Sequence, residues 1–176
     1  MRKMAHSLGL ESAELPESQD FIDSDDYCIL FSEREIREGP IVDEGDRILG
    51  KHKGIVHYTI GQRRGLGIAS DRPLYVKKIN AENNRIVVSG KEGLYSAGFI
   101  ARGFNLIAVD RLDRPYKVRA KIRLKHEEAE AAIFPHGEDK VKVLFDEPQV
   151  AVTPGQSAVL YSGDTVFGGG IIEKAL

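Results

Sequence analysis

A glycine-rich loop at residues 61–67 carries the side chains of this sequence that are best suited to hold an anion. Three glycines, Gly61, Gly65 and Gly67, frame Gln62, Arg63 and Arg64. Glycine allows a sharp turn and a close approach of the backbone to a ligand. Arginine presents a planar fork of donors that matches phosphate. The loop therefore predicts either a tight β-turn or contact with phosphate groups, and both interpretations stay open.

A second set of cations lies in residues 117–125, where every other residue is basic. Its members are Lys117, Arg119, Lys121, Arg123 and Lys125, and they alternate with Val118, Ala120, Ile122 and Leu124. On one strand the cations share a face at intervals of about 6.6 Å, which is the order of the phosphate spacing in a nucleic acid. The pattern predicts a polyanion-binding row or, alternatively, a solvated face on which lysines protect a sheet edge.

Other kinds of chemistry find little support in the sequence. The five histidines are dispersed and none lies near the single cysteine, Cys28, at zinc-ligand spacing, so no metal site is predicted. No Walker-type phosphate loop and no nucleophile elbow is present. One cysteine excludes an intrachain disulfide framework. With no secretory signal and no apolar run near the ~20 residues that cross a bilayer, we expect a cytoplasmic protein without a membrane partner.

Charge is distributed unevenly along the 176 residues, although the total is only −2. Residues 1–50 hold 5 Lys+Arg against 13 Asp+Glu, a balance of −8. Residues 51–125 hold 17 against 5, a balance of +12, and residues 126–176 hold 3 against 9. A basic centre of this size indicates a polyanion partner, unless the acidic blocks neutralise it in the folded protein.

The elements that must position these cations are mostly strands. Short helices are expected at residues 1–10, ending at Gly9, and at residues 27–37. Residues 55–60 form a β-type run, and residues 74–80 and 85–89 predict a hairpin. Further strands are expected at residues 99–108, 117–124, 129–134, 140–145, 157–161 and 170–173. Short strands with regular turns indicate a closed or nearly closed antiparallel barrel.

Several segments together resemble one family. The run His57-Tyr58-Thr59-Ile60-Gly61-Gln62-Arg63-Arg64-Gly65-Leu66-Gly67-Ile68 is similar to the signature of the tRNA-specific 2-thiouridylases, which are also labelled tRNA (5-methylaminomethyl-2-thiouridylate) methyltransferases. Segments at residues 15–20, 146–149, 151–156 and 168–172 match in the same order. The resemblance covers nearly the whole chain.

The resemblance implies a mainly β fold with a small central β-rich domain followed by a six-stranded barrel, similar to a barrel of translation factors. We expect three parts: residues 1–40 as the end of a preceding domain and a helical linker, residues 41–100 as the central domain, and residues 101–176 as the barrel. The resemblance also implies that Arg123, Leu124 and Gln156 contact tRNA. Loop and strand chemistry adds Lys121, Lys125, Arg63 and Arg64 to the expected tRNA contacts.

Two departures from the family pattern concern catalysis. The family's second catalytic cysteine directly follows a segment like Glu17-Ser18-Gln19-Asp20, but here Phe21 follows. Cys28 lies several residues later and does not match, so it is a weak candidate for sulfur relay and is better explained as a small buried hydrophobe. The family's ATP-binding first domain has no counterpart here either. The chain itself should therefore bind no cofactor and be inactive alone.

Taken together, the sequence predicts the tRNA-binding C-terminal part of a 2-thiouridylase. In the family, ATP activates the wobble uridine and a persulfide from a sulfur-donor protein supplies the sulfur. Two alternatives stay open: a standalone RNA-binding barrel, and a protein-interaction barrel that does not bind RNA.

Overall fold

The computed structural model describes residues 6–9, 36–137 and 139–176 of a chain that divides into two compact units, residues 1–32 and 33–176. In the first unit, the N–H of Gly9 donates to the carbonyl of His6 at 3.1 Å, and Gly9 has a φ of +64°. This left-handed residue agrees with the predicted end of a helix at Gly9. Cys28 and most of the helix expected at residues 27–37 lie outside the described residues.

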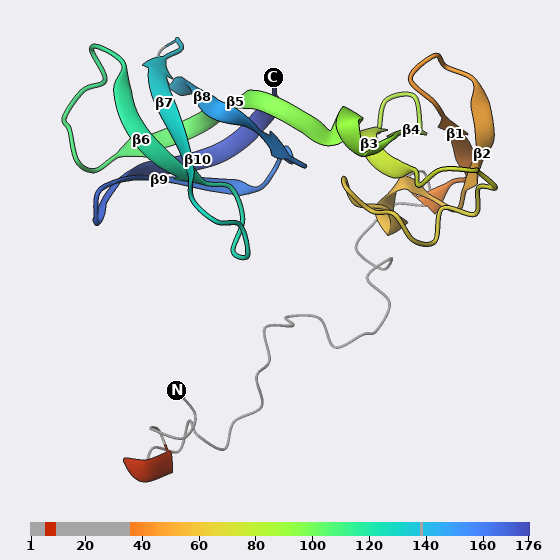
Figure 1. Cartoon of the computed structure of the whole chain (residues 1–176), viewed down its shortest axis with the longest axis horizontal. Helices are drawn as coiled ribbons and strands as arrows, with labels where there is room; N and C mark the ends of the chain where they lie inside the picture. The colour runs from red at the N-terminus through yellow and green to blue at the C-terminus, as the bar shows by residue number, and fades with distance from the viewer. Residues whose placement is uncertain (1–5, 10–35, 138) are drawn as a thin grey trace. The chain divides into compact units, whose positions relative to one another are not determined.

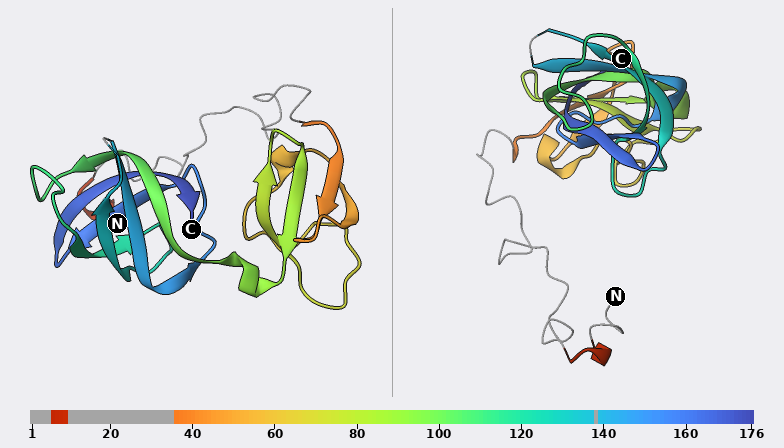
Figure 2. Two further views of the ribbon diagram at one scale, coloured as in Figure 1. Left: turned by 90° about the horizontal axis from the view of Figure 1, so that it is seen from above. Right: turned by 90° about the vertical axis from the view of Figure 1, so that its left-hand side faces the viewer.

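The first sheet of the second unit has four strands in the order β2-β1-β4-β3 (Figure 2). The strands are β1 (Gly39–Val42), β2 (Ile48–His52), β3 (Tyr75–Asn80) and β4 (Arg85–Ser89). β1 and β4 run parallel, whereas the other pairs are antiparallel, so the sheet is mixed. The predicted hairpin of β3 and β4 is confirmed. Its core is made by Ile41, Val76, Ile86 and Val88 from the strands, together with Leu66 from the loop before β3.

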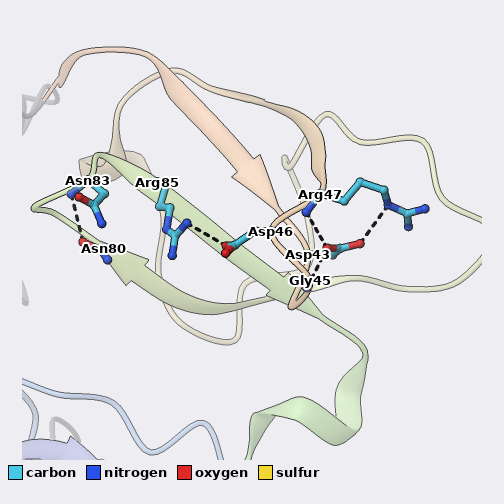
Figure 3. A network of polar contacts seen from close by, with 7 residues as sticks. All are labelled: Asp43, Gly45, Asp46, Arg47, Asn80, Asn83 and Arg85. Carbon is cyan, nitrogen blue, oxygen red and sulfur yellow. Dashed lines mark hydrogen bonds and ion pairs between the residues drawn. The ribbon is translucent and has the colours of Figure 1, made fainter.

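Polar turns fix the ends of these strands (Figure 3). The Asp43 carboxylate accepts the N–H groups of Gly45 and Arg47, both at 3.0 Å, and the Arg47 Nε at 3.1 Å. The backbone N–H of Arg47 is the main reason that the pKa of Asp43 lies below its usual value. Asp46 Oδ1 pairs with Arg85 Nη1 at 2.8 Å and so ties the β1–β2 turn to β4.

A buried histidine also belongs to this sheet. His52 is fully buried; its Nε2 lies 3.0 Å from the carbonyl of Asn84, and its Nδ1 accepts the N–H of Gly54 at 3.1 Å. With Nδ1 accepting, Nε2 carries the proton and donates. Both ring nitrogens are used within the fold, so His52 has a structural role.

The predicted strand at residues 55–60 is wrong. The segment instead contains a 3-10 helix, η3 (Ile55–His57), in which the N–H of Tyr58 donates to the carbonyl of Ile55. Gly54 precedes it with a φ of 125°, a conformation that turns the chain out of the direction of β2. The half-buried Ile55 packs against the core of the sheet without joining the ladder.

The remaining strands close into a six-stranded antiparallel barrel, in the order β10-β5-β8-β7-β6-β9 (Figure 1). After a second 3-10 helix, η4 (Lys91–Leu94), the strands are β5 (Tyr95–Leu106), β6 (Tyr116–Lys121), β7 (Ala129–Pro135), β8 (Lys140–Val150), β9 (Ser157–Ser162) and β10 (Thr165–Ala175). The chain is thus mainly β, as predicted.

Alternation along each strand fills the barrel interior. Phe99, Val118, Ile133, Val143 and Leu160 come from five different strands and are nearly or fully buried. The outward residues between them are polar or half-buried, which is the pattern of a small barrel with a packed interior. Ligands must therefore bind on its outer surface or at its rims. Among the described residues, no helix reaches the length and apolarity that a bilayer crossing requires.

Candidate nucleic-acid interface

The predicted row of five cations does not lie on one strand. β6 ends at Lys121, because its pairing with β7 reaches only Ala120 and its pairing with β9 only Lys121. The chain then turns, and the N–H of His126 donates to the carbonyl of Arg123 at 3.1 Å. Arg123 and Lys125 therefore lie on the β6–β7 loop. The strand interpretation is wrong for these two residues and is correct for Lys117, Arg119 and Lys121.

The guanidinium of Arg119 makes its contacts within the fold. It pairs with Glu128 at 2.9 Å and donates to the carbonyl of Gly163 at 2.6 Å. These contacts join the β6–β7 loop and the β9–β10 turn to β6. Because two protein acceptors occupy it, Arg119 is a poor candidate for a phosphate contact.

A groove of about 460 Å³ lies between β6 and β9 at this end of the barrel. Its lining residues are Lys121, Ile122, Arg123, Leu124, Gln156, Ser157, Val159 and Tyr161. β6 and β9 are paired beneath it, with Lys121 opposite Val159. It brings together four of the residues expected to bind tRNA, which are Lys121, Arg123, Leu124 and Gln156.

Three features of the groove suit a nucleotide. Leu124 is 89% exposed, so a large apolar side chain is held in water where it could cover a base. Arg123 is exposed beside it and offers a guanidinium for phosphate. The side-chain oxygen Oε1 of Gln156 is buried and has no hydrogen-bond partner among the described groups. An unsatisfied buried acceptor is costly, and a ligand N–H or hydroxyl would satisfy it.

The backbone around Gln156 is firmly held. The N–H of Ile172 on β10 donates to the carbonyl of Gln156 at 2.8 Å, and the N–H of Gly155 donates to the carbonyl of Ile172 at 2.8 Å. Gly155 has a φ of 89°, which glycine accommodates without strain. These bonds fix the β8–β9 connection, so that the Gln156 amide is presented from a rigid support.

Lys125 lines a different hollow, of about 620 Å³, on the other side of the β6–β7 loop. Arg123 lines both hollows. The second hollow also contains several carboxylates, Glu127, Glu128, Glu130, Asp146 and Glu147. These acidic groups make the surroundings of Lys125 less favourable for a polyanion than the groove.

Sequence reasoning missed His126, which anchors the loop that carries Arg123. Its Nε2 lies 3.2 Å from Gln149 Oε1, and Gln149 Nε2 donates to the carbonyl of Glu147 at 2.8 Å. Burial, assisted by the positive charge of Arg123, lowers the pKa of His126. The signal that could have revealed it is Gln149 itself, the last residue of the Asp-Glu-Pro-Gln segment.

The glycine-rich loop forms a separate hollow of about 660 Å³, lined by Arg63, Arg72 and the residues from 65 to 74. Gln62 organises the loop: its Oε1 accepts the N–H of Thr59 at 3.0 Å and its Nε2 donates to the carbonyl of Arg64 at 2.9 Å. Leu66, in the middle of the glycine-rich loop, is buried in the core of the sheet and anchors the loop there. Arg64 is exposed but does not line this hollow. The three glycines have φ values of +85°, +76° and +66°, as the turn interpretation requires.

The structure therefore divides the predicted tRNA-binding residues. Lys121, Arg123, Leu124 and Gln156 share the groove, Lys125 faces the acidic hollow, and Arg63 and Arg64 lie on the loop before β3. Within residues 6–9, 36–137 and 139–176, no group of three His, Cys, Asp or Glu side chains is arranged to hold a metal ion.

Comparison with known proteins identifies both folded segments. Residues 29–90 match a family model described as a tRNA methyl transferase PRC-barrel domain, and residues 96–172 match one described as an aminomethyltransferase beta-barrel domain. The chain is 49% identical over 178 residues to the tRNA-specific 2-thiouridylase MnmA of Acetivibrio thermocellus, covering 98% of this chain and 50% of that protein.

Two further relatives agree. The tRNA-specific 2-thiouridylase MnmA 2 of Thermoanaerobacter sp. is 49% identical over 181 residues, and the MnmA of Clostridioides difficile is 46% identical over 181 residues. In both cases the alignment covers 100% of this chain and 50% of the relative. The chain thus spans about half the length of the curated relatives it matches. It belongs to the tRNA-specific 2-thiouridylase family and corresponds to the middle and C-terminal domains of these proteins.

Proposed function

We propose that this chain is the tRNA-binding part of a tRNA-specific 2-thiouridylase, an enzyme that transfers sulfur to the wobble uridine of tRNA in an ATP-dependent reaction. The observation that carries the proposal is the groove between β6 and β9. It combines an exposed guanidinium, an exposed leucine and an amide oxygen that has no hydrogen-bond partner among the described residues, all within one hollow of about 460 Å³.

Each groove residue has a distinct role in this proposal. Arg123 and Lys121 contact phosphates, Leu124 packs against a base or ribose, and Gln156 Oε1 accepts a hydrogen bond from the nucleotide. Base contacts give selectivity, whereas phosphate contacts give most of the affinity. Arg63 and Arg64 add further phosphate contacts outside the groove, and Lys125 adds a weaker one because carboxylates surround it.

The chemical steps belong to the rest of the enzyme. ATP and the sulfur-donor protein would be bound by the part of the relatives that this chain does not match, and Cys28 is assigned no catalytic role. The chain would contribute by holding the tRNA so that its anticodon reaches the catalytic site, which raises the rate by orienting the substrate. The whole enzyme would act in the cytoplasm.

Binding of tRNA by the purified chain tests the proposal. Fluorescence anisotropy with labelled tRNA at about 0.1 M salt should give saturable binding, and Arg123→Gln combined with Leu124→Ser should weaken it. The matched control is Lys51→Gln combined with Ile48→Ser, which removes one exposed cation and one exposed apolar side chain from β2. Absence of tRNA binding by the folded chain would contradict the proposal and would favour a barrel that binds other proteins.

The chain alone should show no sulfur transfer and no ATP hydrolysis. The reason is that the part of the relatives expected to bind ATP is not matched here, and the described residues hold no phosphate-binding loop that opens a helix. The measurement is release of AMP with tRNA present. Measurable AMP release by the purified chain in the presence of tRNA would show that the catalytic assignment is wrong.

A further inference from the structure

The outer surface of the barrel carries a row of four side chains that crosses four strands. Lys174 on β10 lies opposite Ile100 on β5, Ile100 lies opposite Lys142 on β8, and Lys142 lies opposite Phe134 on β7. Neighbouring strands are about 4.8 Å apart, so the row is about 14 Å long. Figure 1 shows these strands in the barrel. The row therefore alternates cation, aliphatic, cation and aromatic across a continuous sheet.

This row faces away from the barrel interior. Phe99, Ala101, Val143 and Ile133, which flank members of the row along their strands, are fully buried in the core. Because side chains alternate along a strand, Ile100, Lys142 and Phe134 must point outward. They are partly exposed, and Lys174 is exposed. The side chain of Phe134 is thus half-buried on the outer surface of the barrel, opposite Lys142.

A second pair of cations extends the same surface. Arg102 on β5 lies directly opposite Lys140 on β8, an arrangement of like charges that is unfavourable for strand pairing. Glu173 offsets one of them, since Lys140 Nζ lies 2.8 Å from Glu173 Oε1. Its hydrogen bond to Lys140, together with the nearby charges of Arg102 and His136, lowers the pKa of Glu173. The described side chains named for this surface therefore include four cations, Arg102, Lys140, Lys142 and Lys174, and one carboxylate, Glu173.

We propose that this outer cationic face, made of Ile100, Arg102, Phe134, Lys140, Lys142 and Lys174, is a second RNA-binding surface. Its cations would contact phosphates, and Phe134 would stack on an unpaired base. Cations that alternate with an accessible aromatic ring on a sheet surface are typical of proteins that bind single-stranded nucleic acid. An acidic protein would also be attracted by the charges, but a half-buried aromatic ring between cations favours stacking on an unpaired base.

The face is separate from the groove. The groove is built on β6 and β9, whereas the outer cationic face is built on β10, β5, β8 and β7. The inference rests on the proposed function, because it assigns a second surface for the same RNA substrate. The unfavourable pairing of Arg102 with Lys140 then has a reason, since a phosphate backbone would supply the missing counter-charge.

The test compares variants of the whole chain in binding to tRNA and to a single-stranded oligouridylate of about ten nucleotides. Lys142→Gln combined with Lys174→Gln should make the plot of log affinity against log salt shallower by about 1.4–1.8. With an unchanged affinity extrapolated to 1 M salt, that slope change corresponds to a loss of affinity of about 15- to 30-fold at 0.15 M salt. Lys142→Arg combined with Lys174→Arg keeps both charges and should bind almost as the wild type does.

Phe134→Leu tests the stacking contact independently. It keeps an apolar side chain but removes the ring, so affinity for the oligouridylate should fall at least about fivefold. The matched control for the charge variants is Lys51→Gln combined with Lys91→Gln, which removes two exposed charges from other elements.

The outcomes separate this inference from the proposed function. If the wild type binds tRNA and the groove variant weakens binding, but the Lys142/Lys174 variant binds with unchanged affinity and slope, the outer cationic face is not an RNA surface. If Phe134→Leu does not fold, the charge variants still decide the question. If the wild type binds neither RNA, both proposals fail.

Discussion

At the scale of single residues, His126 shows how a small anchor supports the proposed binding site. Its ring N–H reaches Gln149 at the end of β8, and the N–H of its own backbone closes the turn at Arg123. Gln149 Nε2 donates to Glu147, which orients its Oε1 as an acceptor for His126. The neutral imidazole is therefore the form that fits, since burial of the ring and the nearby charge of Arg123 disfavour its protonated form.

This geometry predicts how stability depends on pH. The pKa of His126 is lowered by folding, so the unfolded chain binds a proton more readily than the folded chain does. The stability that this residue contributes is fully present above the unfolded pKa of about 6.5 and is lost as the pH falls toward the lower folded pKa. His126→Gln removes the titrating group, and so the drop in melting temperature between pH 7.5 and pH 5.5 should be smaller in the variant.

Thermal unfolding followed by circular dichroism at the two pH values measures this difference. Both proteins should have the same far-ultraviolet spectrum at pH 7.5. An equal or larger drop in the variant would mean that His126 does not resist protonation in the folded state.

At the scale of elements, the structure explains why β10 contains three consecutive glycines, Gly168, Gly169 and Gly170. The sequence alone indicates no physical role for them. A side chain at Gly170 would place its Cβ 2.9 Å from Cδ2 of Phe104 and 3.0 Å from the carbonyl of Arg102. A Cβ added at Gly168 would lie 2.7 Å from Cε1 of the same ring. The ring of Phe104 packs on the bare backbone of β10, so glycine is needed for strand packing rather than for a ligand.

Gly170→Ala should therefore destabilise the barrel by about 1–3 kcal/mol, the usual cost of an overpacked site. Urea unfolding gives the free energy. Gly45→Ala is the matched control, because its new Cβ would come no closer than 3.4 Å to Asp43 and its cost should stay within about 0.5 kcal/mol. Equal stabilities for the two variants would show that Phe104 moves aside at no cost.

The elements also show where sequence reasoning succeeds and where it stops. Period-two alternation identified every strand of the barrel, because one face of each strand is buried. It failed at Ile55–His57, where apolar residues pack as a 3-10 helix after Gly54. It also extended β6 past Lys121, because alternation of basic and apolar residues continues through Leu124 while the pairing with both neighbours has ended.

At the scale of the whole molecule, the basic block of residues 51–125 contributes to more than one surface. Arg123 and Lys121 line the groove, Arg63 and Arg72 line the loop hollow, and Arg102 belongs to the outer cationic face. Lys140, Lys142 and Lys174 lie in an acidic block, so a count along the chain does not reveal the charge of the face they share. Strand pairing, which brings distant residues together, had to be seen in the structure.

The candidate site was predictable in its residues but not in its geometry. The resemblance to the family named Arg123, Leu124 and Gln156, and the structure places them in one groove with Lys121. The buried, unsatisfied oxygen of Gln156 depends on three-dimensional packing, and no sequence pattern indicates it. The division into residues 1–40, 41–100 and 101–176 stays a prediction.

The salt dependence of tRNA affinity tests the central claim, that the groove binds tRNA, most directly. Each phosphate contact contributes a slope of roughly −0.7 to −0.9 to log affinity against log salt, so Lys121→Gln combined with Arg123→Gln should make the slope shallower by about 1.5 and weaken binding. Exposed charges contribute little to folding, and so the double variant should keep the wild-type melting temperature. An unchanged affinity and slope for the folded double variant, relative to the wild type, would contradict the account.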